Sequence, residues 1–285
     1  MKRFLILSLL IWLFSVGNQV VQSQGSMNIM TFNIRLDHEG DGQHNWRYRK
    51  NYAAELLVNE SVDIVGTQEV LKNQLDDLLE LSPQYAYVGV GRFDGKTGGE
   101  YSAILYKRNR FEVIRSGNFW LSETPDSIGS KGWDAACERI VTWAIFNDLS
   151  TGESFAFFNT HFDHMGQIAR IKSAELIVEK AHQIAENLPV ILCGDFNGSP
   201  DSKPIQSILE SGWLKNTYSI ANRKSGPSWS FHDFGRLPVD QRQLIDFIFV
   251  TDSFQVLSYK NIFKEINNTF YSDHNPIVVQ MLIAD

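Results

Sequence analysis

Six short segments of this sequence each place a polar side chain at or near the end of an apolar run that is typical of a β-strand. The side chains in question are Asn33, Glu69, His161, Asp195 with Asn197, Asp246, and Asp273 with His274. Carboxylates are ligands that Mg²⁺ prefers. Imidazoles and amides can activate a water molecule and stabilise charge on a phosphoryl group. Gathered at a common edge, these groups would support metal-assisted reaction at a phosphate ester.

The elements that must position these side chains are strands mixed with a few helices. We expect strands at residues 27–35, 62–67, 85–90, 101–106, 111–120, 139–149, 154–162, 190–195, 244–250, 255–259 and 277–283, and helices at 46–58, 71–81, 167–186 and 202–209. Strand–helix units alternate with adjacent hairpins, which argues against a purely parallel, doubly wound sheet. The expected fold is therefore α/β, with two mixed β-sheets packed face to face and helices outside.

At these residues the sequence resembles the endonuclease/exonuclease/phosphatase superfamily, which includes deoxyribonucleases, sphingomyelinases, inositol polyphosphate 5-phosphatases and nocturnin-like deadenylases. The resemblance runs from Asn33 to His274, with all six segments in the family's order. It implies a four-layer α/β sandwich and the hydrolysis of a phosphoester. The segments 245–248 and 272–274 are closest to the nocturnin, deadenylase and sphingomyelinase branches, and the 5-phosphatase signatures are not evident.

The resemblance also implies a metal site. Glu69 would be the principal ligand of Mg²⁺, with Mn²⁺ as an alternative ion. Asn33 would share the metal shell or orient Glu69, and Asp273 would be a further ligand or an orienting group. Without the other segments, a single Glu after a strand would be read as a solvated surface residue, and the Asn as satisfying a strand-end backbone group.

The catalytic roles follow from the same resemblance. Asp195 would orient or deprotonate the attacking water, Asn197 would position it, and His161 would donate to a non-bridging phosphate oxygen. Asp246 and His274 would form a dyad in which the carboxylate fixes the imidazole tautomer. His274 could then act as general base or as a cationic phosphate clamp, and both roles stay open. The structural alternatives are tight turns and a histidine that is satisfied within the core.

Two further residues near these segments need separate interpretation. Arg139 precedes an expected strand and could contact the substrate phosphate, although an ordinary surface arginine fits equally well. His164 follows His161 by three residues, which raises the question of zinc. We set zinc aside because no Cys pair or His/Glu partner with zinc spacing appears.

The amino terminus has the layout of a secretory signal peptide. Lys2 and Arg3 precede an apolar run over 4–16, and a small-residue cleavage site is present at 21–23. The run is short for a membrane span, which needs about 20 apolar residues. We therefore expect residues 1–23 to be removed, no stable membrane span, and a secreted or periplasmic protein. Residues 24–285 are expected to form a single catalytic domain and a monomer.

The charge balance bears on the substrate. The chain has 26 Lys and Arg against 33 Asp and Glu, giving a net charge of −7. Proteins that bind nucleic acid without sequence preference rely on many cationic contacts to phosphates. Long nucleic acid is therefore disfavoured, and a small sugar, nucleotide or lipid head-group ester is favoured. The alternatives are an extracellular nuclease and a noncatalytic surface-binding protein. Cys137 and Cys193 are expected as thiols, with a disulfide left open.

Overall fold

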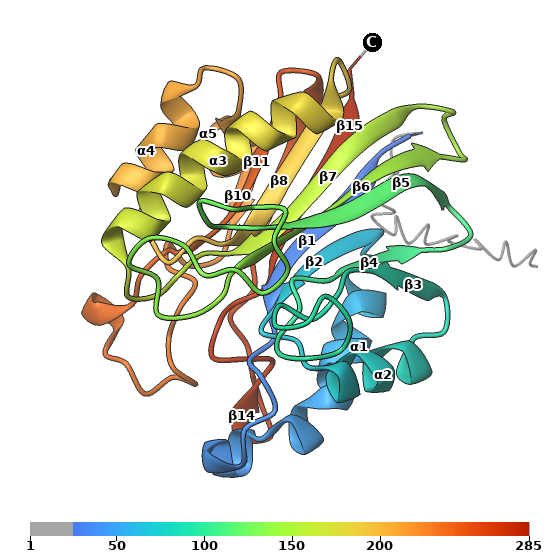
Figure 1. Cartoon of the computed structure of the whole chain (residues 1–285). Coiled ribbons are helices and arrows are strands. Elements are labelled where there is room, and N and C mark those ends of the chain that lie inside the picture. The colour runs from blue at the N-terminus through green and yellow to red at the C-terminus, as the bar shows by residue number, and fades with distance from the viewer. Residues whose placement is uncertain (1–24, 285) are drawn as a thin grey trace, which may run out of the picture.

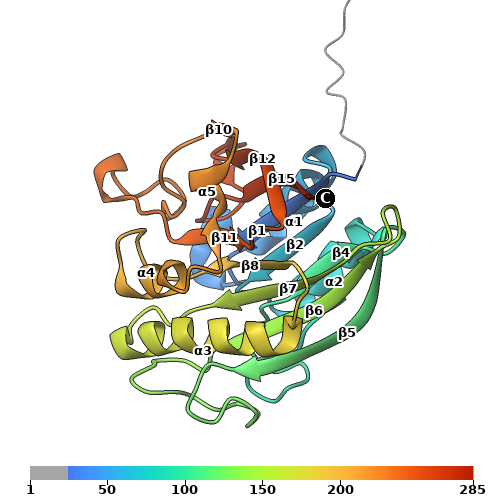
Figure 2. The same ribbon diagram turned by 90° about the horizontal axis from the view of Figure 1, so that it is seen from above.

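The computed structural model describes residues 25–284, so the predicted signal peptide lies outside the described residues. Two large mixed sheets pack face to face, and helices cover their outer faces (Figure 1). The view from above shows this layering, with α3 outside one sheet and α1 and α2 beyond the other (Figure 2). The expected α/β sandwich of two mixed sheets with outer helices is confirmed.

The first sheet has seven strands. In spatial order they are β10 (Arg223–Ser225), β12 (Phe254–Asn261), β15 (Ile277–Ile283), β1 (Met27–Asn33), β2 (Ile64–Gln68), β4 (Ile104–Lys107) and β3 (Tyr85–Val88). Helices α1 (Trp46–Asn59) and α2 (Lys72–Leu81) cover its outer face, where Leu56 and Leu75 share a buried cluster with Val65 of β2. Asn45 begins α1 by accepting a hydrogen bond from the Arg47 amide at 3.2 Å.

The second sheet has six strands. Their order is β5 (Phe111–Trp120), β6 (Ile140–Asp148), β7 (Ser154–His161), β8 (Val190–Asp195), β11 (Asp246–Val250) and β9 (Lys215–Asn216). Helices α3 (Gln167–Ala185) and α4 (Lys203–Glu210) cover its outer face through buried apolar residues such as Ile177 and Ile205. The core between the two sheets contains Ile29, Ile64 and Ile191. Burial of these side chains is the main stabilisation that the sandwich provides.

Strand direction brings the predicted functional residues to one edge of the sandwich. β1 and β2 are parallel, as are β7 and β8, so Asn33 and His161 lie at matching carboxyl ends. β11 is antiparallel to β8, and its first residue, Asp246, pairs with Asp195. β15 is antiparallel to β1, so the segment before β15, which carries His274, lies at this edge too. Residues more than two hundred positions apart therefore meet.

The structure differs from the sequence expectation mainly in short elements. The strand expected at 101–106 begins only at Ile104, whereas Tyr101 forms an isolated bridge with Val70 and donates its hydroxyl to the Lys96 carbonyl. The elements that the pattern missed are η1 (Glu39–His44), β9, α5 (Thr217–Ile220), β10, η2 (Val239–Gln241), β13 (Glu265–Ile266) and β14 (Thr269–Phe270). Elements of two to six residues are too short to show a hydrophobic period.

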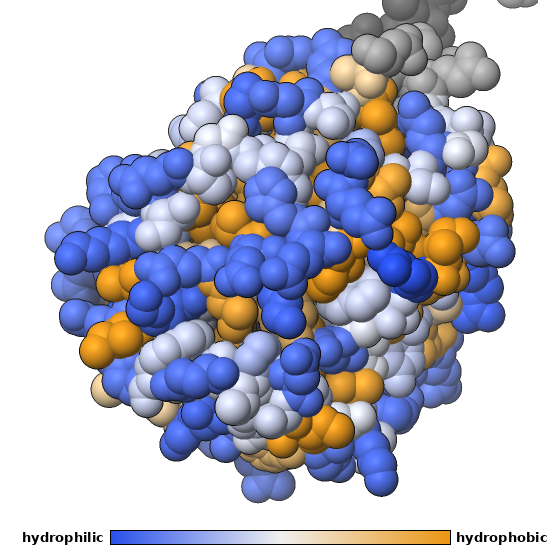
Figure 3. Space-filling view, turned by 45° about the horizontal axis from the view of Figure 1, so that its top comes forward, coloured by the Kyte–Doolittle hydropathy of each residue, from blue (hydrophilic) through white to orange (hydrophobic). Residues whose placement is uncertain are grey.

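No helix within residues 25–284 combines the length and the apolar character that a membrane crossing requires. On the face drawn in Figure 3, hydrophilic residues predominate and apolar ones are interspersed among them. Both cysteines are thiols in this part of the chain: Cys193 is buried in β8 and Cys137 is half-buried.

A buried polar contact joins the two sheets close to the edge that carries the predicted functional residues. Gln68 at the end of β2 donates to Asn159 Oδ1 of β7 at 2.7 Å, and Asn159 Nδ2 donates to the carbonyl oxygens of Thr67 and Ala103 at 2.9 Å each. Gly66 permits this approach because a Cβ there would lie 2.7 Å from Asn159 Oδ1 and closer still to Cys193 Sγ. Buried amides paired in this way fix the alignment of the sheets.

We predict that Gly66→Ala lowers the free energy of unfolding by about 1–3 kcal/mol, because the added methyl group forces the sheets apart. Urea denaturation measures the change. Combining Gly66→Ala with Cys193→Ala removes the nearer clash, so the double variant should lose less than the sum of the single losses. Strict additivity would contradict the close contact between β2 and β8.

Arg49 holds together the chain segments that carry the predicted site. It is fully buried and donates to the carbonyl oxygens of His44 at 2.6 Å, Ile34 at 2.7 Å, Tyr271 at 2.8 Å and Arg35 at 3.2 Å. The end of β1 and the segment before β15 are thus joined by one guanidinium group. A planar group with five donors suits several carbonyl oxygens in different directions.

Arg49→Lys should therefore lower the free energy of unfolding by about 2 kcal/mol, since an ammonium cannot reach all four carbonyl oxygens. The matched control is Arg47→Lys, an exposed position on the same helix, which should change stability by less than about 0.5 kcal/mol. Equal unfolding midpoints for the two variants in urea would show that Arg49 does not join these segments.

Candidate active site

Asn33 lies at the centre of the candidate site. Its Nδ2 atom donates to Glu69 Oε1 at 3.1 Å and to Asp195 Oδ2 at 2.9 Å, while its Oδ1 accepts from the Arg35 amide at 3.1 Å. Glu69 follows β2 in the first sheet and Asp195 ends β8 in the second. Of the two roles expected for Asn33, the geometry matches the orientation of Glu69, because its nitrogen rather than its oxygen faces the carboxylates.

Glu69 and Asp273 present carboxylates near one cationic group. Glu69 has a backbone φ of 59°, a conformation that is strained for a non-glycine residue and common at functional sites. Its Oε2 accepts from the Leu36 amide at 3.3 Å and lies 3.7 Å from Arg35 Nη1. Asp273 Oδ2 lies 3.9 Å from Arg35 Nε. Burial raises the pKa of Asp273.

This donor set fits a hard divalent cation. The carboxylates of Glu69 and Asp273 line the same cavity, and both attract the positive charge of Arg35. Oxygen donors with access to water are the surroundings that Mg²⁺ prefers. Asp195, Asp246 and His274 also offer ligand atoms within 4.8 Å of one another. In that second group, however, the imidazole is already hydrogen-bonded to Asp246.

Asp195, Asn197 and His161 form a second set of contacts. The backbone amide of Asn197 donates to Asp195 Oδ1 at 2.9 Å, and the side-chain Nδ2 of Asn197 donates to the Phe162 carbonyl at 3.0 Å. That same Nδ2 lies 3.0 Å from His161 Nε2. With the Asn197 nitrogen as donor, His161 Nε2 accepts and the ring proton lies on Nδ1, which is buried and has no hydrogen-bond partner, so the ring in this position does not offer the expected N–H to a phosphate oxygen. Burial, followed by the charge of Arg139, lowers the pKa of His161, so the ring is neutral.

Asp246 and His274 form the predicted dyad. His274 Nδ1 lies 2.8 Å from Asp246 Oδ2, which also accepts from Ser230 Oγ at 2.6 Å. On the other side of the ring, Nε2 is 3.8 Å from Asp195 Oδ2. Burial acts to lower the pKa of His274, but Asp246, Asp195 and Asp273 outweigh it and raise the pKa to about 10. Burial and then Asp246 raise the pKa of Asp195 to about 7.

These groups open into a cavity of about 900 Å³, here called the main cavity. Its lining includes Glu69, Arg139, His161, Asp195, Asn197, Asp273 and His274 from the predicted site. Asn33 and Asp246 lie behind this lining and support it. Every residue predicted for the site thus lies in the cavity wall or hydrogen-bonds to it.

The other residues that line the main cavity were not among those predicted for the site. They are Arg35, Leu36, Arg92, Glu100, Cys137, His164, Phe231, Asp233, Leu237, Gln241, Gln243 and Ile245. The segments 92–100 and 223–241 supply part of this set. Arg92 and Glu100 form an ion pair at 2.7 Å, which no local motif predicts because neither residue follows a recognisable strand end.

Arg139 is buried, which excludes the ordinary surface arginine. Its Nε atom lies 3.5 Å from Asp163 Oδ2 and its Nη2 atom 3.1 Å from His164 Nδ1. Asp163 is itself held by the amides of Met165 at 2.9 Å and Gly166 at 2.7 Å. Because Asp163 is fixed in this way, it holds Arg139 at the wall of the main cavity.

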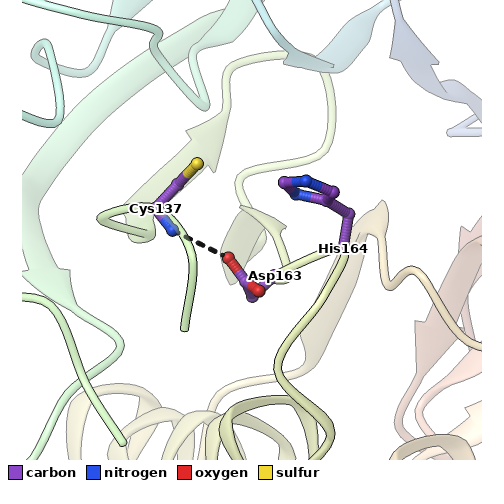
Figure 4. A group of neighbouring side chains, drawn as sticks. All are labelled: Cys137, Asp163 and His164. Atoms are coloured by element: carbon purple, nitrogen blue, oxygen red, sulfur yellow. Dashed lines mark hydrogen bonds between the residues drawn. The ribbon is translucent and has the colours of Figure 1, made fainter. Parts of the chain in front are cut away.

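Cys137, Asp163 and His164 also come close enough to suggest a metal site, with ligand atoms within 4.8 Å of one another (Figure 4). The Asp163 carboxylate, however, accepts the Cys137 amide at 3.0 Å, as the dashed line in Figure 4 shows. Arg139 donates toward Asp163 Oδ2 and His164 Nδ1, so the lone pair of that imidazole nitrogen is already used and does not face an ion. The group therefore anchors loops around Arg139, in keeping with the zinc interpretation set aside above.

Comparison with known proteins places this geometry in a family. A structure of an endonuclease/exonuclease/phosphatase from Bacteroides vulgatus is 43% identical and superposes with a TM-score of 0.88, covering 90% of this chain and 99% of that chain. A mannosyl-6-phosphatase from Bacteroides thetaiotaomicron is 36% identical, with a TM-score of 0.84 and coverage of 90% and 100%. The human nocturnin catalytic domain, at 19% identity and a TM-score of 0.72, shares the fold.

Curated relatives match over part of their length. Carbon catabolite repressor protein 4 homolog 3 of Arabidopsis thaliana is 24% identical over 71% of this chain and 46% of that relative. Human nocturnin is 22% identical over 78% of this chain, which spans 55% of its length. The sequence profile described as "Endonuclease/Exonuclease/phosphatase family" matches residues 30–274. The chain therefore belongs to the endonuclease/exonuclease/phosphatase family, whose members are hydrolases that act on phosphoesters.

Proposed function

We propose that this protein is an exported, Mg²⁺-dependent phosphohydrolase that removes phosphate from a small sugar phosphate monoester. The observation that carries the proposal is the convergence of Glu69, Asp195 and His274 on one cavity, held by Asn33 across the two sheets. The likeness to a mannosyl-6-phosphatase, at 36% identity over 90% of the chain, supports the choice of substrate class.

The cavity suits a small ester. A volume of about 900 Å³ lies within the range of small-molecule sites, and its walls are polar and charged. Arg35, Arg92 and Arg139 line it together with several carboxylates. A cavity of mixed charge favours a phosphate that carries hydroxyl groups nearby over a long uniform polyanion, which would need an extended cationic surface.

Glu69 and Asp273 would hold the metal ion, and Asn33 would keep the Glu69 carboxylate in place. When bound, Mg²⁺ would neutralise phosphate charge and assist departure of the leaving group. The remaining work falls to residues of the chain. Asp195 is placed to take a proton from the attacking water, because the Asn33 nitrogen and the Asn197 amide fix its two oxygens.

His274 would act as the cationic phosphate clamp rather than as the general base. Its ring is held by Asp246 at 2.8 Å, and Asp195 lies 3.8 Å from its other nitrogen. A ring between two carboxylates favours the imidazolium form, which donates to a phosphate oxygen. Arg139, which lines the same cavity, would supply a second cationic donor. The Asn197 Oδ1 atom, unlike its nitrogen, is available to hold water.

We predict that Glu69→Gln and His274→Gln each lower kcat/KM for mannose 6-phosphate by a factor of about 10²–10⁴, because the first would weaken metal binding and the second would remove a cationic donor to the phosphate in the transition state. Phosphate release from the purified protein measures this, with chelation by EDTA abolishing activity and added Mg²⁺ restoring it. Glu179→Gln on α3 is the control: its carboxylate accepts only from Gln183, one turn along the helix, and activity should be unchanged.

Several outcomes would replace the proposed function. Cleavage of plasmid DNA without hydrolysis of small esters would favour the extracellular nuclease. If the wild type and both variants all bind sugar phosphates and none of them releases phosphate, the noncatalytic binding protein is favoured. Full activity in the presence of EDTA would show that the reaction does not require a divalent metal ion.

Export is tested separately. On expression in a bacterial host with an outer membrane, the mature protein should be recovered from the periplasm or the medium, and mass spectrometry should place its first residue near Gln24. Retention of residues 1–23 on a membrane-bound protein would instead indicate an uncleaved anchor.

A further inference from the structure

A second cavity lies beside the main cavity. Its volume is about 320 Å³, and Asn197 and Gln243 line both cavities. The remainder of its wall comes from the beginnings of α3 and α4, with Arg170 on the first helix and Lys203 on the second. We call it the Arg170–Lys203 cavity. Because the two cavities share wall residues, one bound molecule could occupy both.

The charge of the Arg170–Lys203 cavity is one-sided. Two cationic residues line it and no acidic residue does, although acidic residues outnumber basic ones in the chain as a whole. Within the described residues, neither Arg170 nor Lys203 forms an ion pair with a carboxylate. Lys172, on the same helix as Arg170, pairs instead with Glu175 at 2.7 Å. Arg170 Nη1 donates to the backbone carbonyl of Asp163 at 2.9 Å, but no carboxylate neutralises either cation, so their positive charge can act on a ligand.

The first turn of α4 adds to this preference for an anion. Ser202, the residue before the helix, donates its hydroxyl to the Ser199 carbonyl at 2.6 Å and does not cap the first turn. Pro204 has no N–H and the Gln206 amide donates to the Ser202 carbonyl at 3.0 Å, which leaves the amides of Lys203 and Ile205 without a side-chain partner. An uncapped helix start carries partial positive charge and attracts anions. Here it coincides with two cations that have no carboxylate partner and with a cavity that shares Asn197 with the main cavity.

We propose that the Arg170–Lys203 cavity binds a second phosphate group on the substrate, while the phosphate that is hydrolysed lies in the main cavity. The proposal deepens the proposed function and rests on it. Two cationic side chains and a helix start match the double charge of a phosphate better than the single charge of a carboxylate. The preferred substrate class is then a sugar carrying two phosphates rather than one.

The test compares mannose 1,6-bisphosphate with mannose 6-phosphate. Calorimetric titration without divalent metal gives the two dissociation constants in the absence of turnover. The wild type should bind the bisphosphate about tenfold more tightly. This preference should fall to about twofold or less in the double variant Arg170→Gln/Lys203→Gln. It should also weaken at high ionic strength, because the contacts are electrostatic.

Lys172→Gln is the matched control, since it removes a cation from the same helix outside the Arg170–Lys203 cavity. This variant should keep the full preference for the bisphosphate. Equal affinity of the wild type for both sugars, or an undiminished preference in the double variant, would overturn the inference. If Lys172→Gln loses the preference for the bisphosphate to the same extent as the double variant, the preference reflects the overall charge of the protein, and the inference is equally overturned.

The same proteins separate failure of this inference from failure of the proposed function. Suppose that, with Mg²⁺ present, phosphate is released from both sugars and no preference depends on Arg170 and Lys203. The proposed phosphohydrolase activity then stands, and the second phosphate subsite is wrong. If neither sugar releases phosphate but the bisphosphate binds more tightly in a way that depends on those two residues, the proposed reaction is wrong and the second phosphate subsite stands.

Discussion

The hydrogen bond from Asn33 to Asp195 is the interaction on which the candidate site depends. It is buried and joins the end of β1 in one sheet to the end of β8 in the other. The same nitrogen also holds Glu69, so one amide sets the spacing between the expected metal ligand and the group expected to handle water. The Gln68–Asn159 contact supports it one layer deeper, where it aligns the two sheets. Rigid strands then carry this alignment to every group at the edge.

Gathering carboxylates in this way has an energetic cost. Asp195, Asp246 and Asp273 are all buried, and unpaired carboxylates are costly to remove from water. The structure offsets this with His274, whose ring contacts Asp246 and lies near Asp195, and with Arg35, which lies between Asp273 and Glu69. Because the compensation is mutual, the charges act as a network rather than as independent pairs. The positive charge of a metal ion and the negative charge of a phosphate would both be accommodated by shifts within this network.

Sequence alone could place the site residues because each of them follows or begins a strand, and strand ends have a recognisable pattern. Asn33 and Asp195 were predictable for this reason, and the two-sheet sandwich followed from the mixture of hairpins and strand–helix units. Arg49 was not, because it stands in a basic run that looks like a solvated helix start, and only its burial against distant carbonyl oxygens reveals its role. Arg92 and Glu100 lie in a glycine-rich loop, where periodicity carries no information about which side chains turn inward.

The pairing of Asp195 with both His161 and Asp246 has a consequence for how such a protein can change over time. A shift of one residue in β7, β8 or β11 would turn its functional side chain to the opposite face, so these strands tolerate almost no insertions or deletions. The segments 92–100 and 233–241, which form other walls of the main cavity, lie outside this register, whereas Phe231 and His232 pair with His274 and Asp273. The two segments can lengthen, shorten or exchange residues without moving the reacting groups. The strands therefore fix the positions of the reacting groups, and the separate loop segments can change substrate preference. One scaffold can diversify in this way without losing its reactivity.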